Sequence, residues 1–200
     1  MKLDVVHDLQ SVYRKVVNAT SRPGTISNLS NEALYVDKGR FPCTAATLLL
    51  ALTLLDQEVT FKVYSAEADK TSREINQLTN SKAVKVNEAD FIFVLQDAKE
   101  GSLEEAIELG KHGALMNPHK SATIIVEADC INKGEDLLLT GPGIEMSEPV
   151  SVCLSGNWIE SRKQRNREYP LGIDLMIVDK DHQLLALPRT TQIIENRVVV

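Results

Sequence analysis

Near the end of the chain, the stretch from Tyr169 to Ile193 contains two groups of residues that could bind an anion or form an ion pair. It reads YPLGIDLMIVDKDHQLLALPRTTQI, with P-L-G-I-D before two apolar runs and P-R-T-T after them. The guanidinium fork of Arg189 and the hydroxyls of Thr190 and Thr191 suit a phosphate-like oxyanion. Asp174 could instead pair with Arg189 and satisfy its charge. The spacing of these residues leaves both interpretations open.

The two apolar runs, LMIV and LLAL, predict a β-hairpin that brings these groups together. We expect a four-residue loop, Asp179 to His182, at its tip. This pairing sets Asp174 opposite Leu187. It also sets Gly172 opposite Arg189, where a glycine leaves room for the arginine stem or for another backbone segment. Arg189 and Asp174 then lie one diagonal step apart, within reach of a charge-assisted hydrogen bond.

Two basic stretches could extend such a site. In S-R-P-G, Pro23 and Gly24 predict the end of a helix, and Arg22 is a candidate anion contact. The stretch S-R-K-Q-R-N-R-E, from Ser161 to Glu168, runs directly into P-L-G-I-D. It could be the solvated face of a helix, a positive rim around the end of the hairpin, or a contact for an acidic partner protein.

Other patterns for catalysis or metal binding are weak. G-P-G at 141–143 lacks the G-x-G-x-x-G fingerprint, since position 146 is methionine, and we expect a tight turn there. His112 and His119 have no third ligand at a recognisable spacing, so we expect no metal site. The sequence contains no G-x-S-x-G nucleophile elbow. No motif taken alone identifies an enzyme or a catalytic residue.

Composition restricts the class of protein. A net charge of -6 argues against nucleic-acid binding. The three cysteines, Cys43, Cys130 and Cys153, form no C-x-x-C pair and follow no secretory signal, which indicates buried thiols in a cytoplasmic protein. The apolar run from Cys43 to Leu55 is 13 residues long, too short to span a membrane. With 200 residues, we expect a single domain over 1–200.

The pattern of apolar residues predicts an α/β fold. The expected helices are Asp4–Ser21, Pro42–Leu55, one starting at a Thr71/Glu74 capping box, one from a Ser102/Glu105 capping box to Gly110, and Trp158–Glu168. The expected strands are Val59–Tyr64, Phe91–Leu95, Ala122–Ala128, Leu137–Thr140 and the two of the hairpin, with a turn at Asn117-Pro118. Strands such as LMIV are apolar on both faces, so helices must cover both faces of the sheet. We therefore expect a three-layer α/β/α sandwich with a mixed sheet.

Six segments, in collinear order over nearly the whole chain, resemble the PhnH family of the bacterial carbon–phosphorus lyase system. The two most specific are Y-P-L-G-I-D and L-P-R-T-T. The six segments are YRKVVNATSRPG (13–24), LLLALTLLDQE (48–58), PHKSAT (118–123), LTGPGI (139–144), YPLGID (169–174) and LPRTT (187–191). Tyr13 and Tyr169 stand where the family often has phenylalanine, and Thr20 replaces a more usual methionine.

The resemblance implies a cytoplasmic protein whose fold is similar to that of PLP-dependent transferases but lacks PLP, so we expect no cofactor. It implies a homodimer that assembles with the PhnG, PhnI, PhnJ and PhnL subunits. The implied reaction is the synthesis of α-D-ribose 1-methylphosphonate 5-triphosphate, in which an alkylphosphonate displaces adenine from MgATP. The main catalytic chemistry is implied to lie on a partner, and this chain to be a binding or scaffolding subunit.

No catalytic residue can be transferred to this sequence from the resemblance. We predict a binding cluster, with a phosphonate or ATP-derived ligand as its candidate occupant. Its members are Arg22, Pro23, Gly24, Gly172, Asp174, Arg189, Thr190 and Thr191. Two other functions remain open: a free-standing PLP-type transferase, in which Asp174 would face the ring nitrogen, and a separate phosphonate- or nucleotide-binding module.

Overall fold

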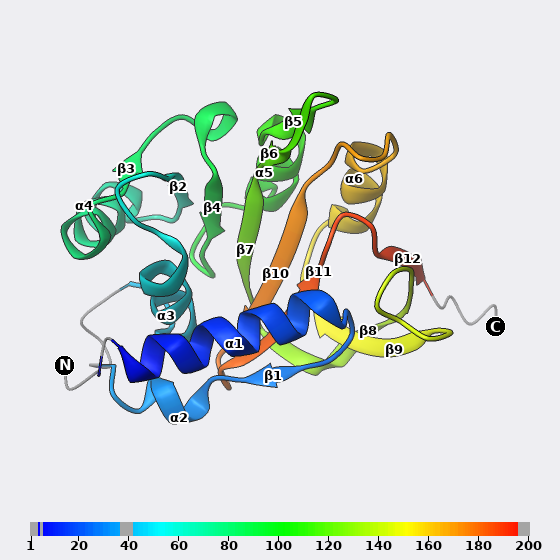
Figure 1. The fold of residues 1–200 in the computed structure, drawn as a ribbon, viewed down its shortest axis with the longest axis horizontal. Coiled ribbons are helices and arrows are strands. Elements are labelled where there is room, and N and C mark those ends of the chain that lie inside the picture. The colour runs from blue at the N-terminus through cyan, green and yellow to red at the C-terminus, as the bar shows by residue number, and fades with distance from the viewer. Residues whose placement is uncertain (1–3, 5, 37–41, 196–200) are drawn as a thin grey trace.

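A seven-stranded mixed sheet forms the centre of the protein in the computed structural model, which describes residues 4, 6–36 and 42–195 (Figure 1). The strand order is β1-β11-β10-β7-β4-β2-β3. Strand β11 runs antiparallel to both of its neighbours, and the other pairs are parallel. The strands are β1 (Ser27–Asn28), β2 (Thr60–Tyr64), β3 (Lys82–Ala83), β4 (Phe91–Val94), β7 (Thr123–Ala128), β10 (Asp174–Asp179) and β11 (Gln183–Leu187).

Both faces of this sheet are covered, as predicted. In β10, Met176 and Val178 pack in one core with helices α1 to α4. Leu175 and Ile177 point the other way, into a second core with helices α5 and α6. The helices are α1 (His7–Ser21), α2 (Ser30–Ala33), α3 (Ala45–Leu54), α4 (Ala68–Thr79), α5 (Ser102–Leu109) and α6 (Trp158–Arg165), with a short 3₁₀ turn η1 (Val86–Glu88).

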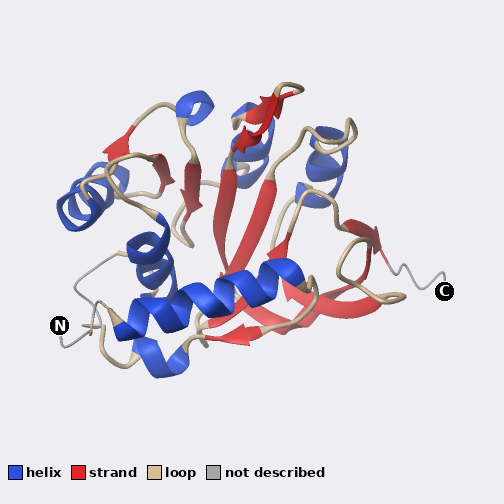
Figure 2. Cartoon of the chain, in the orientation of Figure 1, coloured by secondary structure: helices blue, strands red, loops and turns tan. Residues whose placement is uncertain are grey.

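Two small antiparallel sheets complete the fold and were not predicted. The larger, ordered β12-β8-β9, contributes to the second core and lies beside α6, to the right in Figure 2. Its strands are β8 (Cys130–Thr140), β9 (Glu148–Cys153) and β12 (Gln192–Glu195). The smaller is a hairpin of β5 (His112–Ala114) and β6 (Asn117–Ser121). Leu115 and Met116 form its turn, so the predicted turn at Asn117-Pro118 is wrong.

Several helix boundaries also differ from the predictions. Helix α3 starts after Thr44, whose hydroxyl caps it by accepting the N–H of Thr47 (3.2 Å), and Pro42 lies outside it. Helix α4 already begins at Ala68, so Thr71 is an interior residue whose hydroxyl donates to the carbonyl of Glu67. Ser102 is the first residue of α5 and forms no side-chain cap. Helix α6 ends at Arg165, before the predicted Glu168.

The tip of the β10–β11 hairpin differs from the prediction by one residue. Leu175 pairs with Leu187, which leaves a three-residue loop, and His182 closes this loop with φ +61°. The carboxylate of Asp179, the last residue of β10, accepts the backbone N–H groups of Asp181 in the loop, of Gln183 in β11 and of Ile131 (2.9 Å). The predicted four-residue loop, and the pairing of Asp174 with Leu187, are therefore wrong.

No helix in the described part of the chain has both the length and the apolar character needed to cross a membrane.

Candidate functional site

The predicted ion pair between Arg189 and Asp174 is present at the start of β10. The backbone N–H and Nε of Arg189 donate to Oδ1 of Asp174 (2.7 and 3.2 Å), and Nη2 donates to Oδ2 (2.5 Å). The two side chains are 16% and 26% exposed. The open end of the hairpin therefore brings P-L-G-I-D and P-R-T-T together as predicted, although the register differs by one residue.

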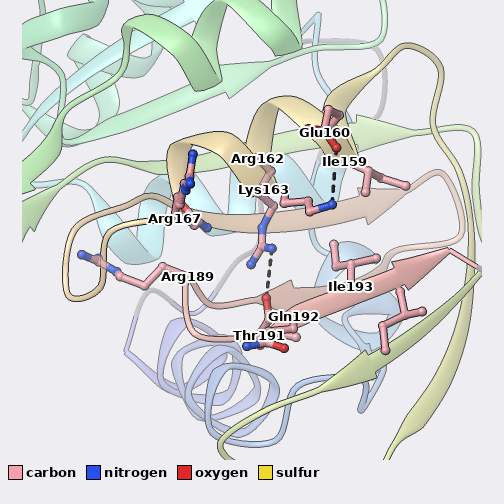
Figure 3. Close-up of a pocket in the computed structure, with 11 residues that line it drawn as sticks. Ile159, Glu160, Arg162, Lys163, Arg167, Arg189, Thr191, Gln192 and Ile193 are labelled. Carbon is pink, nitrogen blue, oxygen red and sulfur yellow. Dashed lines mark hydrogen bonds and ion pairs between the residues drawn. The ribbon is translucent and has the colours of Figure 1, made fainter.

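The remaining donors of the Arg189 guanidinium are directed to the protein itself. Nη1 donates to the carbonyl of Pro118 (2.8 Å), and Nη2 also donates to the hydroxyl of Ser121. Both acceptors belong to β6. In Figure 3 this guanidinium points away from Thr191. These contacts favour the structural interpretation, in which Arg189 fastens the hairpin end to the β5–β6 hairpin.

Gly172 lies close to the stem of Arg189, as predicted although not in the predicted pairing, and closer still to the side chain of Asn166, which was not predicted. A Cβ atom at Gly172 would lie 2.5 Å from Oδ1 of Asn166 and 3.3 Å from Cβ of Arg189, at φ +140°. The Asn166 side chain accepts the N–H of Ile173 (2.8 Å) and donates to its carbonyl (3.1 Å). Only glycine allows α6 and the hairpin to approach this closely.

Arg22, Pro23 and Gly24 lie at a different cavity from Arg189. Arg22 and Pro23 line a space of about 540 Å³ together with residues 143–148. The G-P-G segment forms the predicted turn, and it connects the two places. A Cβ atom at Gly143 would lie 2.4 Å from the carbonyl oxygen of Ser21, and one at Gly141 would lie 2.8 Å from that of Thr190. The predicted residues thus form a continuous region but do not share one cleft.

The P-R-T-T segment folds into a turn in which the N–H of Thr191 donates to the carbonyl of Pro188 (2.9 Å). Thr190 is half-buried. Thr191 is buried, with 2% of its surface exposed. Its hydroxyl oxygen forms no hydrogen bond to any described residue. Thr191 is the member of the predicted cluster that combines an unused polar atom with a place in a cavity wall.

Arg162 is a buried residue at this site, whereas the sequence analysis placed its stretch on a solvated helix face, in a rim around the hairpin end or at a partner contact. It is 3% exposed and donates to the carbonyls of Thr191 (3.0 Å), Pro188 (2.6 Å) and Leu187 (3.2 Å). Burial lowers the pKa of its guanidinium to about 10, against the opposing effect of the Asp174 charge, so it stays protonated at neutral pH. Its spacing from Trp158 and Ile159 on the buried face of α6 is the signal that could have identified it.

A cleft of about 730 Å³ lies between α6 and the segment that enters β12 (Figure 3). Among the described lining residues, four are basic and one, Glu160, is acidic, with its carboxylate 3.7 Å from Lys163. The lining residues are Ile159, Glu160, Arg162, Lys163, Asn166, Arg167, Arg189, Thr191, Gln192, Ile193 and Ile194.

The histidines and cysteines offer little chemistry. Within the described residues, no three side chains of His, Cys, Asp or Glu gather as a metal site would require. Cys43, Cys130 and Cys153 are free thiols of intermediate exposure, so the prediction of buried thiols is wrong. Burial and the charge of Glu127 raise the pKa of Cys43 to about 12.

Comparison with known proteins identifies the family. Residues 3–194 match the family model described as bacterial phosphonate metabolism protein (PhnH). HtxG of Stutzerimonas stutzeri, named as a candidate C-P lyase subunit, is 29% identical over 92% of this chain and 85% of its own length. The α-D-ribose 1-methylphosphonate 5-triphosphate synthase subunit PhnH of Rhizobium meliloti (strain 1021) is 26% identical over 95% of this chain and 92% of its own. The segments with the close contacts described above, S-R-P-G, G-P-G, P-L-G-I-D and P-R-T-T, all lie within the matched residues, and this chain belongs to the PhnH family.

Proposed function

We propose that this chain is the PhnH subunit of an α-D-ribose 1-methylphosphonate 5-triphosphate synthase and acts in the cytoplasm as a binding or scaffolding subunit. The observation that carries the proposal is the family match over residues 3–194. It is supported by a relative of the same name that aligns with 95% of the chain. In the reaction that the family resemblance implies, an alkylphosphonate displaces adenine from MgATP.

The contacts of the motif residues support a role other than catalysis. Asp174 and Arg189 neutralise each other and hold the hairpin end against β6. Gly172 allows the close approach of Asn166 at the end of α6, and Arg162 donates hydrogen bonds to two carbonyls of the P-R-T-T turn. Groups held in this way position a surface. The main chemistry of the synthase is therefore assigned to a partner subunit.

Exposed apolar residues beside the motif region support a docking role. Leu115 and Met116, at the tip of the β5–β6 hairpin, are 74% and 91% exposed, and Tyr169 is 77% exposed. They flank Pro118 and Pro170, whose carbonyls both accept from Nη1 of Arg189 (2.8 and 3.5 Å). Adjacent exposed apolar side chains, such as Leu115 and Met116 at one hairpin tip, favour contact with another protein. The proposed partners are PhnG, PhnI, PhnJ and PhnL, with a homodimer of this chain inside the complex.

The assembly proposal is tested by co-purification. The tagged chain, expressed with the four partner subunits, is expected to retain them, and a Leu115→Asp/Met116→Asp variant is expected to retain less. A matched variant at a remote exposed apolar site, Leu78→Asp on α4, is expected to behave as the parent chain. A strain lacking the gene should fail to grow on methylphosphonate as its phosphorus source. Normal growth of that strain, or an untouched complex without this chain, would contradict the proposal.

The expected similarity to PLP-dependent transferases, without PLP, remains part of the proposal. A mostly parallel seven-stranded sheet with helices on both faces is compatible with it. A free-standing PLP enzyme is disfavoured, because the charge of Asp174, which would have to face the pyridine nitrogen, is already paired with Arg189. Addition of PLP to the purified chain should give no new absorption band.

A further inference from the structure

Two buried polar atoms in the wall of the α6–β12 cleft have no partner among the described residues. They are Nε of Arg162 and the hydroxyl oxygen of Thr191. Both side chains are almost fully buried, at 3% and 2% exposure, and both line the same cleft. Native proteins pair nearly all such atoms, because an unpaired buried donor loses its hydrogen bonds to water without replacement. Two unpaired donors at one cavity wall indicate that the cavity binds a hydrogen-bond acceptor.

The charge around these atoms indicates an anionic acceptor. Arg162 keeps its positive charge without a hydrogen-bonded carboxylate, since the acceptors of its other nitrogens are backbone carbonyls. Lys163 and Arg167, from α6 and the residues after it, add two more positive charges to the lining. Among the described lining residues, Glu160 is the one that carries a carboxylate. This local excess of positive charge stands out in a protein whose net charge is -6.

Arg189 is not expected to bind the ligand, although it is one of the two arginines of the predicted cluster, with Arg22. Although Arg189 lines the cleft, its guanidinium donates to Asp174, Pro118 and Ser121 and points away from Thr191 (Figure 3). Arg162 instead has one nitrogen left over after it has supported the P-R-T-T turn. The anion-binding donors thus come from Thr191, from α6 and from the residues that follow α6.

Part of the lining is apolar. It comes from Ile159 of α6 and from Ile193 and Ile194 of β12, and Ile194 is 52% exposed. The volume of about 730 Å³ lies in the range of small-molecule sites and exceeds the space that one tetrahedral anion fills. We infer that this cleft binds an organic polyphosphate of nucleotide size, with its phosphorus oxyanion against Arg162, Thr191, Lys163 and Arg167 and its organic part against the isoleucines.

Calorimetric titration of the full chain tests this inference with three probes: ATP, tripolyphosphate and methylphosphonate. ATP is expected to bind, tripolyphosphate to bind more weakly, and methylphosphonate to bind most weakly because it offers one small oxyanion. Raising the salt concentration should weaken binding of the first two, since exposed Lys163 and Arg167 supply part of the attraction. Absence of binding by all three probes would overturn the inference, and equal affinities for ATP and tripolyphosphate would overturn the role of the isoleucines.

Three variants locate the site. Thr191→Val removes the unpaired hydroxyl and keeps the shape, so it should weaken ATP binding about 10-fold while the melting temperature stays the same or rises. Arg167→Glu should weaken ATP binding at least 10-fold. Arg73→Glu, the same charge change on exposed α4 at the far end of the sheet, should leave binding unchanged.

The result is independent of the proposed subunit role, because the isolated chain is titrated. ATP binding by a chain that fails to assemble would support the cleft and contradict the subunit role. Unchanged ATP binding in both Thr191→Val and Arg167→Glu would overturn the site. Loss of a partner subunit in Arg167→Glu, without any effect on ATP binding, would also overturn it and assign the cleft to an acidic segment of that partner.

Discussion

The guanidinium of Arg189 donates hydrogen bonds to both carboxylate oxygens of Asp174 at the open end of the β10–β11 hairpin, and its backbone N–H donates to one of the same oxygens. The same guanidinium holds the carbonyl of Pro118 in β6. One side chain therefore joins three segments that are distant in the sequence. Removal of the Arg189 side chain should therefore lower the stability of the protein.

We expect Arg189→Ala to lower the free energy of unfolding by about 2–4 kcal/mol. Breaking a fully buried ion pair costs about 3–5 kcal/mol, and we expect a smaller loss here because the two side chains are 16% and 26% exposed. Urea unfolding followed by circular dichroism measures it. Arg22→Ala is the matched control, since Arg22 is exposed and should change stability by less than about 0.5 kcal/mol. A stable Arg189→Ala protein that has lost only complex activity would contradict the structural role.

Gly172 should tolerate no side chain. Gly172→Ala places a Cβ atom 2.5 Å from Oδ1 of Asn166 at φ +140°, so both steric crowding and backbone strain are expected to destabilise it, by about 2–4 kcal/mol. Gly101→Ala is the control for strain alone, because Gly101 has φ +82° and no atom within 4 Å of an added Cβ. The Gly101→Ala variant should lose only about 1 kcal/mol of unfolding free energy. Equal losses in the two variants would show that the contact with Asn166 is unimportant.

Local patterns predicted the fold class and the ion pair well, because both depend on neighbouring residues. The apolar faces of β10 required cover on both sides, and the hairpin brings Asp174 near Arg189 in either register. The predicted loop was one residue too long. Asp179 belongs to β10, and its carboxylate accepts the N–H of Ile131, which is 48 positions away in the sequence. Arg162 was missed for a similar reason, since its acceptors lie 25 to 29 positions further along the chain.

The division of the predicted cluster between two cavities was equally inaccessible to sequence reasoning. Whether Arg22 reaches the cleft beside Thr191 depends on how the G-P-G turn packs between them. That packing is set by the small sheet of β8, β9 and β12, which was not predicted. A motif order along the chain indicates membership of a family, but it does not state which motif residues share a cavity.

The buried carboxylate of Glu32 should make stability depend on acid pH. Burial raises the pKa of Glu32, but hydrogen bonds from Lys15 (2.7 Å) and Ser11 (2.6 Å) outweigh this effect and hold the pKa below its ordinary value of 4.5. The folded state therefore binds the proton less well than the unfolded chain. The resulting stabilisation is complete above pH 4.5 and is lost as the pH falls through the lowered pKa.

Comparison of the parent chain with Glu32→Gln isolates this effect. At pH 7 the variant should be less stable by about 1–2 kcal/mol, because Lys15 loses its charged partner. The difference should shrink as the pH falls below 4.5, as measured by urea unfolding at several pH values. Asp90, whose pKa is also lowered on balance, is present in both proteins and cancels in the difference. A difference that is independent of pH would mean that the Glu32 charge does not contribute.

The thiol of Cys43 should resist alkylation although it is not fully covered. Burial, with a further contribution from the charge of Glu127, raises its pKa to about 12, so on the order of one molecule in 10⁴ carries the reactive thiolate at pH 8. Mass spectrometry after a short treatment with iodoacetamide should find Cys43 unmodified in the folded protein and modified in urea. Glu127→Gln removes one cause of the raised pKa and should accelerate labelling modestly, because burial is the larger cause. Rapid labelling of Cys43 in the folded parent chain would show that neither cause protects the thiol.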